Sequence, residues 1–441
     1  MKKMFCLLTV VCCLLFYCLI SPEFGFADTW TQKADIGGTQ RLVAFGFSIA
    51  DKGYAGGGID HSNGMHFKDF WEYNPVTGIW TQKADLPINM SGGHVSFVIN
   101  NKGYIGTGAF GGSSETKLFL EYDPTLNEWS RKADFGGTAR TFASGFAVAG
   151  KGYIGTGWGD YGNNDPYNQN PILKDFWEYD PSTDTWTKKA DFGGGIARDD
   201  AVGFSIGNKG YIGTGYSEDS EETLKKDFWE YDPTTDTWTR KADFAGTARG
   251  LAIGFSIGNK GYIGTGDDGI DEMGINETDF WEYDPATDIW TQRADFGGGA
   301  RIMPVGFSIG NKGYLGMGMV YDPNGGPMTY KQDFWEYDPG FVVKNDFNKD
   351  GISDILWRKD STGQVVLWFM NSDGTRSSYK TLLTDVNWTI AETGDFNKDG
   401  ISDILWRKDS TGQVVLWFMN SDGTRSNYKT LLTDVNWTVV P

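Results

Sequence analysis

The chain has 441 residues, a formal net charge of -19, 61 glycines and an aromatic content of 15%. A strongly acidic surface repels phosphate backbones, so nucleic acid is not expected as a partner. The high glycine and aromatic content favours many short strands joined by tight turns.

Residues 1–27 have the pattern of a secretory signal peptide. Two lysines precede an apolar run from Met4 to Ile20, and a small-residue site, GFA, ends at Ala27. The run is also about long enough for a membrane helix, so a retained anchor is the alternative. All four cysteines lie in this segment, which leaves the mature chain without disulfides or thiolate metal sites. We expect cleavage after Ala27, no integral membrane segment in the mature chain, and a secreted protein that is extracellular, on the cell surface or in the periplasm.

From residue 28 onward the sequence is repetitive. The triplet Lys-Gly-Tyr occurs six times at intervals of roughly 50 residues, beginning at Lys52, Lys102, Lys151, Lys209, Lys260 and Lys312. In the fourth unit, residues 201–208 and 209–215 are two apolar segments separated by Gly-Asn, and residues 227–233 and 236–243 follow across an Asp-Pro turn. Four short antiparallel strands per unit, with no helical periodicity, predict the blade of a β-propeller.

These units resemble the kelch repeat, in the variety related to the central domain of galactose oxidase. The resemblance covers Asp28 to about Phe341 and rests on six copies of KGY.G.G, six of F.EY.P or a near relative, and the Trp that follows. It implies an all-β, six-bladed propeller but no particular activity, because kelch propellers include oxidases, epimerases and binding modules. Galactose oxidase chemistry is excluded, since it needs a cysteine-modified tyrosine at a copper site and the mature chain has no cysteine.

The sixth unit lacks its last strand. It runs through DFWEYDP at residues 333–339 and then departs from the repeat, without the segment that carries the following Trp. The mature N-terminus, DTWTQKAD at residues 28–35, matches that missing segment. We predict that residues 29–35 pair with residues 333–337 and close the ring, which leaves no open strand edge.

Two groups of side chains are candidate ligand contacts on the face of the propeller that carries the variable loops. Arginines stand thirteen residues before the Tyr of the triplet, and in similar kelch domains the matching position borders the central mouth and can bind an anion. These are Arg41, Arg140, Arg198, Arg249 and Arg301. The alternative is that each arginine pairs with an acidic neighbour, such as Asp134 or Asp191, and holds adjacent blades together. Trp158, Tyr161 and Tyr167, in the longest loop, are candidate platforms for a sugar.

After Phe341 a second repeat begins. Residues 346–394 are copied almost perfectly at residues 395–441, and each copy opens with DFNKDGISDILWR. The copies resemble the FG-GAP or VCBS-type repeats of secreted and surface proteins, which are also blade-like. We therefore divide the chain into a signal peptide at 1–27, a propeller at 28–341 and a small C-terminal β domain of two repeats at 342–441.

The opening loop of each copy carries oxygen side chains at positions 1, 3, 5 and 9. They are Asp346, Asn348, Asp350 and Asp354 in the first copy and Asp395, Asn397, Asp399 and Asp403 in the second, with Ile352 and Ile401 placed to offer a backbone carbonyl. Ca²⁺ takes about six to eight such oxygens, and closely spaced carboxylates repel one another without a cation. The pattern predicts two calcium sites, and a pair of Asx-turns that only shape a hairpin is the alternative.

The sequence favours a binding or adhesion module that recognises a glycan or an extracellular protein on the variable-loop face. The alternative is a sugar-acid epimerase or lyase that uses arginine and carboxylates, although no residue stands out as catalytic. A deep pocket on that face with carboxylates of shifted pKa would favour the enzyme, and a flat acidic face with scattered aromatic residues would favour binding.

Overall fold

The computed structural model describes residues 28–60, 62–111, 115–159, 171–193, 195–217, 224–269, 276–320, 328–339, 345–371, 374–397, 399–408 and 410–434. Every regular element within these ranges is a β-strand. Accordingly, none of the described residues belongs to a helix that is long and apolar enough to cross a membrane.

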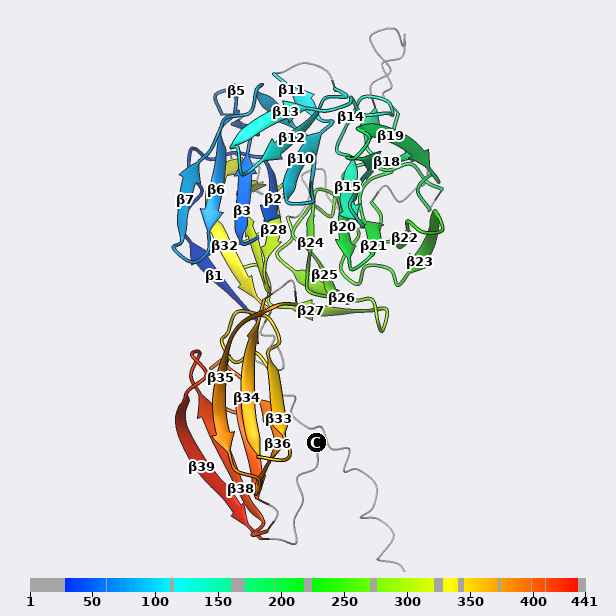
Figure 1. Ribbon diagram of the computed structural model, residues 1–441. Coiled ribbons are helices and arrows are strands. Elements are labelled where there is room, and N and C mark those ends of the chain that lie inside the picture. The colour runs from blue at the N-terminus through cyan, green and yellow to red at the C-terminus, as the bar shows by residue number, and fades with distance from the viewer. Residues whose placement is uncertain are drawn as a thin grey trace, which may run out of the picture.

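Six four-stranded antiparallel sheets surround a common axis (Figure 1). In the first three blades the strands, from the axis outward, are β2 (Phe45–Ile49), β3 (Lys52–Gly56), β6 (Phe70–Asn74) and β7 (Ile79–Gln82); β9 (Val95–Ile99), β10 (Lys102–Gly106), β12 (Phe119–Asp123) and β13 (Glu128–Arg131); and β15 (Ser144–Val148), β16 (Lys151–Gly155), β18 (Phe176–Asp180) and β19 (Thr185–Lys189). In the last three they are β20 (Val202–Ile206), β21 (Lys209–Gly213), β22 (Phe228–Asp232) and β23 (Thr237–Lys241); β24 (Ile253–Ile257), β25 (Lys260–Gly264), β26 (Phe280–Asp284) and β27 (Ile289–Arg293); and β28 (Val305–Ile309), β29 (Lys312–Gly316), β32 (Phe334–Asp338) and β1 (Thr29–Lys33). The chain is therefore an all-β propeller with six blades in its described part, as predicted.

Each inner strand carries a phenylalanine that packs on the glycine of the Lys-Gly-Tyr triplet in the next blade. A Cβ atom on Gly53 would stand 2.3 Å from the ring of Phe307, and one on Gly103 would stand 2.3 Å from the ring of Phe47. The same contact joins Phe97 to Gly152, Phe146 to Gly210, Phe204 to Gly261 and Phe255 to Gly313. Because only glycine permits this approach, the triplet specifies how one blade packs on the next, and the six contacts close a ring.

The N-terminal strand completes the sixth blade. β1 pairs antiparallel with β32, with Thr29 opposite Asp338 and Lys33 opposite Phe334. The Trp30 indole donates a hydrogen bond to the carbonyl of Ala294 in the preceding blade at 3.0 Å. Trp129 and the other tryptophans at this position make the same bond to an alanine carbonyl. The predicted closure by the N-terminal strand is thus confirmed.

Four two-stranded ribbons lie in the loops that join the blades or follow their second strands. They are β4 (Ile59–Asp60) with β5 (Met65–His66), β8 (Met90–Gly92) with β11 (Ala109–Phe110), β14 (Arg140–Thr141) with β17 (Trp158–Gly159), and β30 (Met319–Val320) with β31 (Thr329–Tyr330). These ribbons give the loop face a local framework of backbone hydrogen bonds.

Two further sheets form the C-terminal part of the chain, below the propeller in Figure 1. The first contains β33 (Ile355–Lys359), β34 (Gln364–Met370) and β35 (Arg376–Thr384), and the second contains β36 (Trp388–Gly394), β37 (Asp403–Lys408), β38 (Gln413–Met419) and β39 (Arg425–Thr433). They share a core that includes Phe347, Leu367, Ile404 and Trp406. β36 ends the first sequence copy but pairs with β37 of the second copy. Nearly identical sequences therefore have different surroundings in the two sheets.

Candidate functional site

One residue from each blade join lines the entrance to the centre of the propeller. We call this set the mouth ring; its members are Val43, Gly93, Phe142, Asp200, Leu251 and Met303. All six have a left-handed backbone, with φ between 48° for Val43 and 69° for Gly93. This conformation is uncommon for residues other than glycine.

Hydrogen bonds between neighbouring blades hold the left-handed backbone of four of the six ring members. The amide of Phe142 donates to the carbonyl of Gly93 at 2.9 Å, and the amide of Asp200 donates to the carbonyl of Phe142 at 3.2 Å. Leu251 and Met303 continue the series, each donating to the preceding member of the ring at 3.3 and 3.0 Å. The backbone strain is thus held by bonds that join one blade to the next, and strain of this kind is concentrated at functional sites.

The mouth ring, together with the residue after each member, lines a cavity of about 160 Å³. The following residues are Ala44, His94, Ala143, Ala201, Ala252 and Pro304. A second cavity of about 210 Å³ continues from them between the inner strands. Asp200 and His94 are the ionisable side chains among the described residues of the first cavity, and the other described residues of its lining are apolar side chains and glycine.

Among the described residues, Asp200 is the one carboxylate in the lining of the mouth cavity. Its side chain is partly exposed, but its Oδ1 is buried and has no hydrogen-bond partner among the described residues. Burial raises the pKa of Asp200 well above its ordinary value, and the neighbouring charge of Asp199 adds to the effect. The group is therefore a carboxyl that holds its proton unusually tightly, at the edge of an apolar cavity.

His94 is fixed as a neutral part of the wall. Its Nδ1 lies 2.7 Å from the carbonyl of Thr107, to which it donates, and its Nε2 accepts a hydrogen bond from the amide of Gly92 at 3.2 Å. Burial lowers the pKa of His94 to about 4, against the hydrogen bonds to the backbone. With both ring nitrogens engaged, His94 has no atom left to exchange a proton with a ligand.

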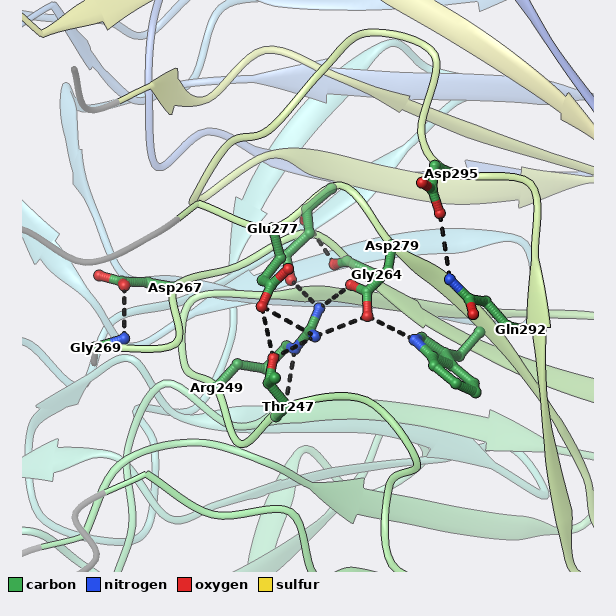
Figure 2. Close-up of polar contacts among 11 residues, drawn as sticks. Thr247, Arg249, Gly264, Asp267, Gly269, Glu277, Asp279, Gln292 and Asp295 are labelled. Carbon is green, nitrogen blue, oxygen red and sulfur yellow. Dashed lines mark hydrogen bonds and ion pairs between the residues drawn. The ribbon is translucent and has the colours of Figure 1, made fainter. Parts of the chain in front are cut away.

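The five arginines predicted to face a ligand are instead fully buried within the blades, with an exposed fraction of 0%. Arg198 pairs with Asp227 through two hydrogen bonds of 2.8 Å and donates a third to the carbonyl of Thr214. Arg41, Arg140, Arg249 and Arg301 repeat the arrangement with Asp69, Asp175, Asp279 and Asp333. Figure 2 shows the copy in the fifth blade, where Arg249 lies between Asp279, Glu277 and Thr247.

Binding of an anionic ligand by these arginines requires exposed guanidinium groups, and all five are buried. The observed geometry agrees with the alternative, an architectural ion pair. The partners, however, are not the aspartates named from the sequence. Asp134 pairs with Arg131 and Asp191 with Lys188 at the surface. Each buried arginine instead forms an ion pair with the aspartate just before the third strand of its blade. This aspartate also accepts a hydrogen bond from the tryptophan two residues later, such as Trp229.

Of the predicted aromatic platforms, only Trp158 lies in the described part of the chain. Its side chain is 42% exposed, and it stands opposite Thr141, the neighbour of Phe142 in the mouth ring. Tyr161 and Tyr167 fall within 160–170, outside the described residues. Trp158 therefore lies on a loop ribbon whose other strand leads into the mouth ring.

The carboxylates of the predicted calcium loops accept hydrogen bonds from backbone amides, most of them in the same loop. Asp346 accepts from Asn348, Asp350 and Gly351 at 3.3, 3.2 and 2.8 Å. Asp354 accepts from Phe347 and Met370, at 2.8 and 3.0 Å. The second copy repeats the pattern with Asp395 and Asp403, while the amides of Ile352 and Ile401 donate to Asp350 and Asp399.

Within the described ranges, no three carboxylate, histidine or cysteine side chains are grouped so that they could hold a metal ion. Burial raises the pKa of Asp403 to about 6, and the charges of Asp399 and Asp395 add to this effect while backbone hydrogen bonds oppose it. The hydrogen bonds described within these loops are those of Asx-turns. Calcium binding by these loops therefore stays a prediction.

The sequence distinguishes Asp200 from the other members of the mouth ring. Each member of the mouth ring stands two residues after the arginine of its unit, or after Ser91 in the second unit. At that position, Asp200 is the one charged residue among Val, Gly, Phe, Leu and Met. Its importance follows from the fold, because the position reaches the axis only when the six blades have closed.

The blades, their Phe-Gly contacts and the strand that closes the ring define a β-propeller of the kelch type, followed by FG-GAP-like repeats. Residues 346–406 match the family model described as "FG-GAP-like repeat". Among solved structures, one titled "Structure of YjhT" is similar to this chain with a TM-score of 0.55 and 14% identity, over 68% of this chain and 96% of that one. At this identity the likeness shows the fold alone. No curated protein sequence matches the chain.

Proposed function

We propose that the chain binds a small, uncharged sugar in the cavity at the mouth ring and that Asp200 transfers a proton to or from it. This develops the enzyme alternative in preference to an adhesion module. The observation that supports it is the Asp200 carboxyl, which is partly open to the cavity, has an unpartnered oxygen and stands among apolar side chains. A strongly shifted pKa in a cavity is typical of functional sites.

The size of the cavity supports a single small ring. Its volume of about 160 Å³ is similar to that of an engineered protein cavity of about 150 Å³ that holds benzene. A monosaccharide is the sugar class of that size, and the exposed Trp158, on the ribbon beside the mouth ring, offers a flat face for its C–H groups. A longer glycan would extend over the loops or into the second cavity between the inner strands.

The charges of the cavity favour an uncharged ligand over a sugar acid. A carboxylate ligand would need a cation, but the arginines are buried in ion pairs with aspartates and His94 is neutral. The buried arginines therefore do not support the hypothesis of an epimerase or lyase that uses arginine.

A carboxyl whose pKa is raised suits proton transfer at oxygen. It can donate its proton through one oxygen while it accepts another at the second oxygen, so an isomerisation of the ligand would leave Asp200 in its original state. Acid–base catalysis by one positioned group contributes about 10²–10⁴-fold to a rate. The apolar ring supports this role because it excludes water that would otherwise stabilise the ionised form.

Export from the cell and calcium binding belong to the same proposal but rest on the sequence of residues 1–27 and of the two DFNKDGISD loops. Binding of a glycan or an extracellular protein by the variable loops is likewise still a proposal. Among the described loop residues it is supported by the exposure of Trp158.

Calorimetry on the full chain with glucose, galactose and N-acetylglucosamine tests the proposed ligand class. We expect at least one of these sugars to bind and Asp200→Leu, which makes the mouth ring wholly apolar, to abolish that binding. Asp243→Asn, at an exposed ion pair with Arg240, is the matched control and should bind as the wild type does. The proposal fails if none of these sugars binds the wild type, or if Asp200→Leu binds them equally well.

A further inference from the structure

The second C-terminal sheet contains a cavity that is separate from the propeller. Its volume is about 200 Å³, and its walls include Trp388, Trp406, Trp417 and Tyr428. These side chains come from β36, β37, β38 and β39, so all four strands of the sheet contribute. Cavities lined by aromatic side chains with a few polar groups are typical of small-molecule sites.

Two donors in this cavity lack an acceptor among the described residues. Trp406 is 1% exposed, and its indole N–H has no hydrogen-bond partner among the described residues. A buried donor without an acceptor is costly, which points to an acceptor supplied from outside the chain. Arg425 also lines the cavity and, within the described part of the chain, makes no ion pair.

Arg425 is held in place by aromatic rings. Its guanidinium carbon lies 4.7 Å from the centre of the Trp417 ring and 4.9 Å from that of Tyr428. Stacking fixes the plane of the guanidinium and leaves its in-plane N–H groups available for a carboxylate. The cavity therefore combines an oriented cation, a buried N–H donor and aromatic walls.

The geometry points to a second ligand site, at Trp406 and Arg425, which binds an acidic sugar residue such as a uronic acid. The sugar carboxylate would pair with the Arg425 guanidinium and a hydroxyl would accept from the Trp406 indole, while the C–H face of the ring packs on Trp388 and Trp417. Gln413 and Thr430, which also line the cavity, provide further polar contacts for hydroxyls. The inference is independent of the proposed function of the mouth ring.

The first C-terminal sheet provides an internal control, because its sequence is nearly identical. Arg376 lies 4.7 Å from the Trp368 ring and 5.0 Å from the Tyr379 ring, as Arg425 does in the second sheet. Trp357, the equivalent of Trp406, is nevertheless 50% exposed. The cause is β36, which places Ile390 opposite Trp406, whereas β33 is the outer strand of its three-stranded sheet. We expect only the second copy to bind.

Calorimetry and tryptophan fluorescence on the full chain test the inference with glucuronic and galacturonic acid, and with glucose and galactose as uncharged counterparts. We expect at least one of the two acids to bind, and Arg425→Gln to weaken that binding about tenfold or more, since the lost contact is a charge-assisted pair. Trp406→Phe should also weaken it. Arg376→Gln and Trp357→Phe, in the first copy, should bind as the wild type does.

Three results would overturn the inference: no binding of either acid, an equal loss in Arg376→Gln and Arg425→Gln, or an equally strong response to inorganic phosphate. Arg425 is exposed, so its substitution leaves the fold intact and a loss of binding reports on the site. Asp200→Leu separates the two cavities, because it should abolish binding of uncharged sugars and leave binding of uronic acids unchanged.

Discussion

The guanidinium of Arg198 and the carboxylate of Asp227 form a two-pronged ion pair, with both N–O distances at 2.8 Å. Arg198 is completely buried and Asp227 is 17% exposed at its side chain. The pair joins the segment before the first strand of the fourth blade, β20, to the residue before its third strand, β22, and it recurs in four other blades. It is therefore a structural element of the repeat.

Loss of Arg198 should destabilise the propeller without affecting ligand binding at the mouth ring. Removing one partner of a buried pair leaves the other charge uncompensated, so Arg198→Ala should lower the free energy of unfolding by about 3–5 kcal/mol. Arg240→Ala removes an exposed pair with Asp243 and should cost at most about 1 kcal/mol. Urea unfolding measures both, and equal effects of the two substitutions would contradict the structural role.

Removal of the N-terminal strand should open the propeller. Deletion of residues 28–38 removes β1 and exposes the edge of β32, an unprotected template for pairing with another chain. We expect aggregation or the loss of cooperative unfolding, seen by size-exclusion chromatography and circular dichroism. A monomeric deletion variant with the stability of the wild type would show that the sixth blade does not need β1.

The raised pKa of Asp200 predicts a specific dependence of stability on pH. Burial raises this pKa from an ordinary value of 3.8, so the folded chain binds the proton more tightly than the unfolded chain. Stability should therefore fall as pH rises above about 4 and level off above the raised pKa. Asp200→Asn removes this contribution. The free energy of unfolding of the variant minus that of the wild type, which is the advantage of the variant, should therefore increase from about pH 4 upward. An advantage that is the same at every pH would contradict the shifted pKa.

Calcium should act on the C-terminal repeats if the predicted sites exist. Binding to the folded state alone raises stability by mass action, so the melting temperature of the C-terminal part should be higher in millimolar Ca²⁺ than in EDTA. Asp350→Ala combined with Asp399→Ala should remove the difference. Identical melting curves in Ca²⁺ and EDTA, with no calcium uptake by calorimetry, would leave the Asx-turn interpretation.

Features set by local sequence were predictable. The Lys-Gly-Tyr triplet identifies the strand pair of each blade, and the missing Trp segment after Asp333 identifies the N-terminus as the closing strand. The identity of the partner of Arg198 was not predictable in this way. Asp191 is closer in sequence, but Asp227 stands at the start of the third strand, beside the arginine in the folded blade.

Features that depend on the assembled fold could not be predicted from single residues. Asp200 becomes significant because the closed ring brings it to the axis beside five uncharged ring members. Trp357 and Trp406 have the same local sequence but differ in exposure, 50% against 1%. The strand that flanks Trp406 causes this difference. It is not part of the local sequence of either tryptophan, so comparing the two repeats predicts the same exposure for both.

The central claim is that Asp200 transfers protons to a sugar bound at the mouth ring. It is tested most directly by NMR exchange measurements of the rate at which the full chain interconverts isomers of a bound uncharged monosaccharide. We predict that the wild type accelerates the interconversion and that Asp200→Asn loses about 10²-fold or more of the acceleration, while Asp243→Asn retains it. Equal rates for the wild type and Asp200→Asn, at a sugar concentration that saturates both, would contradict the claim.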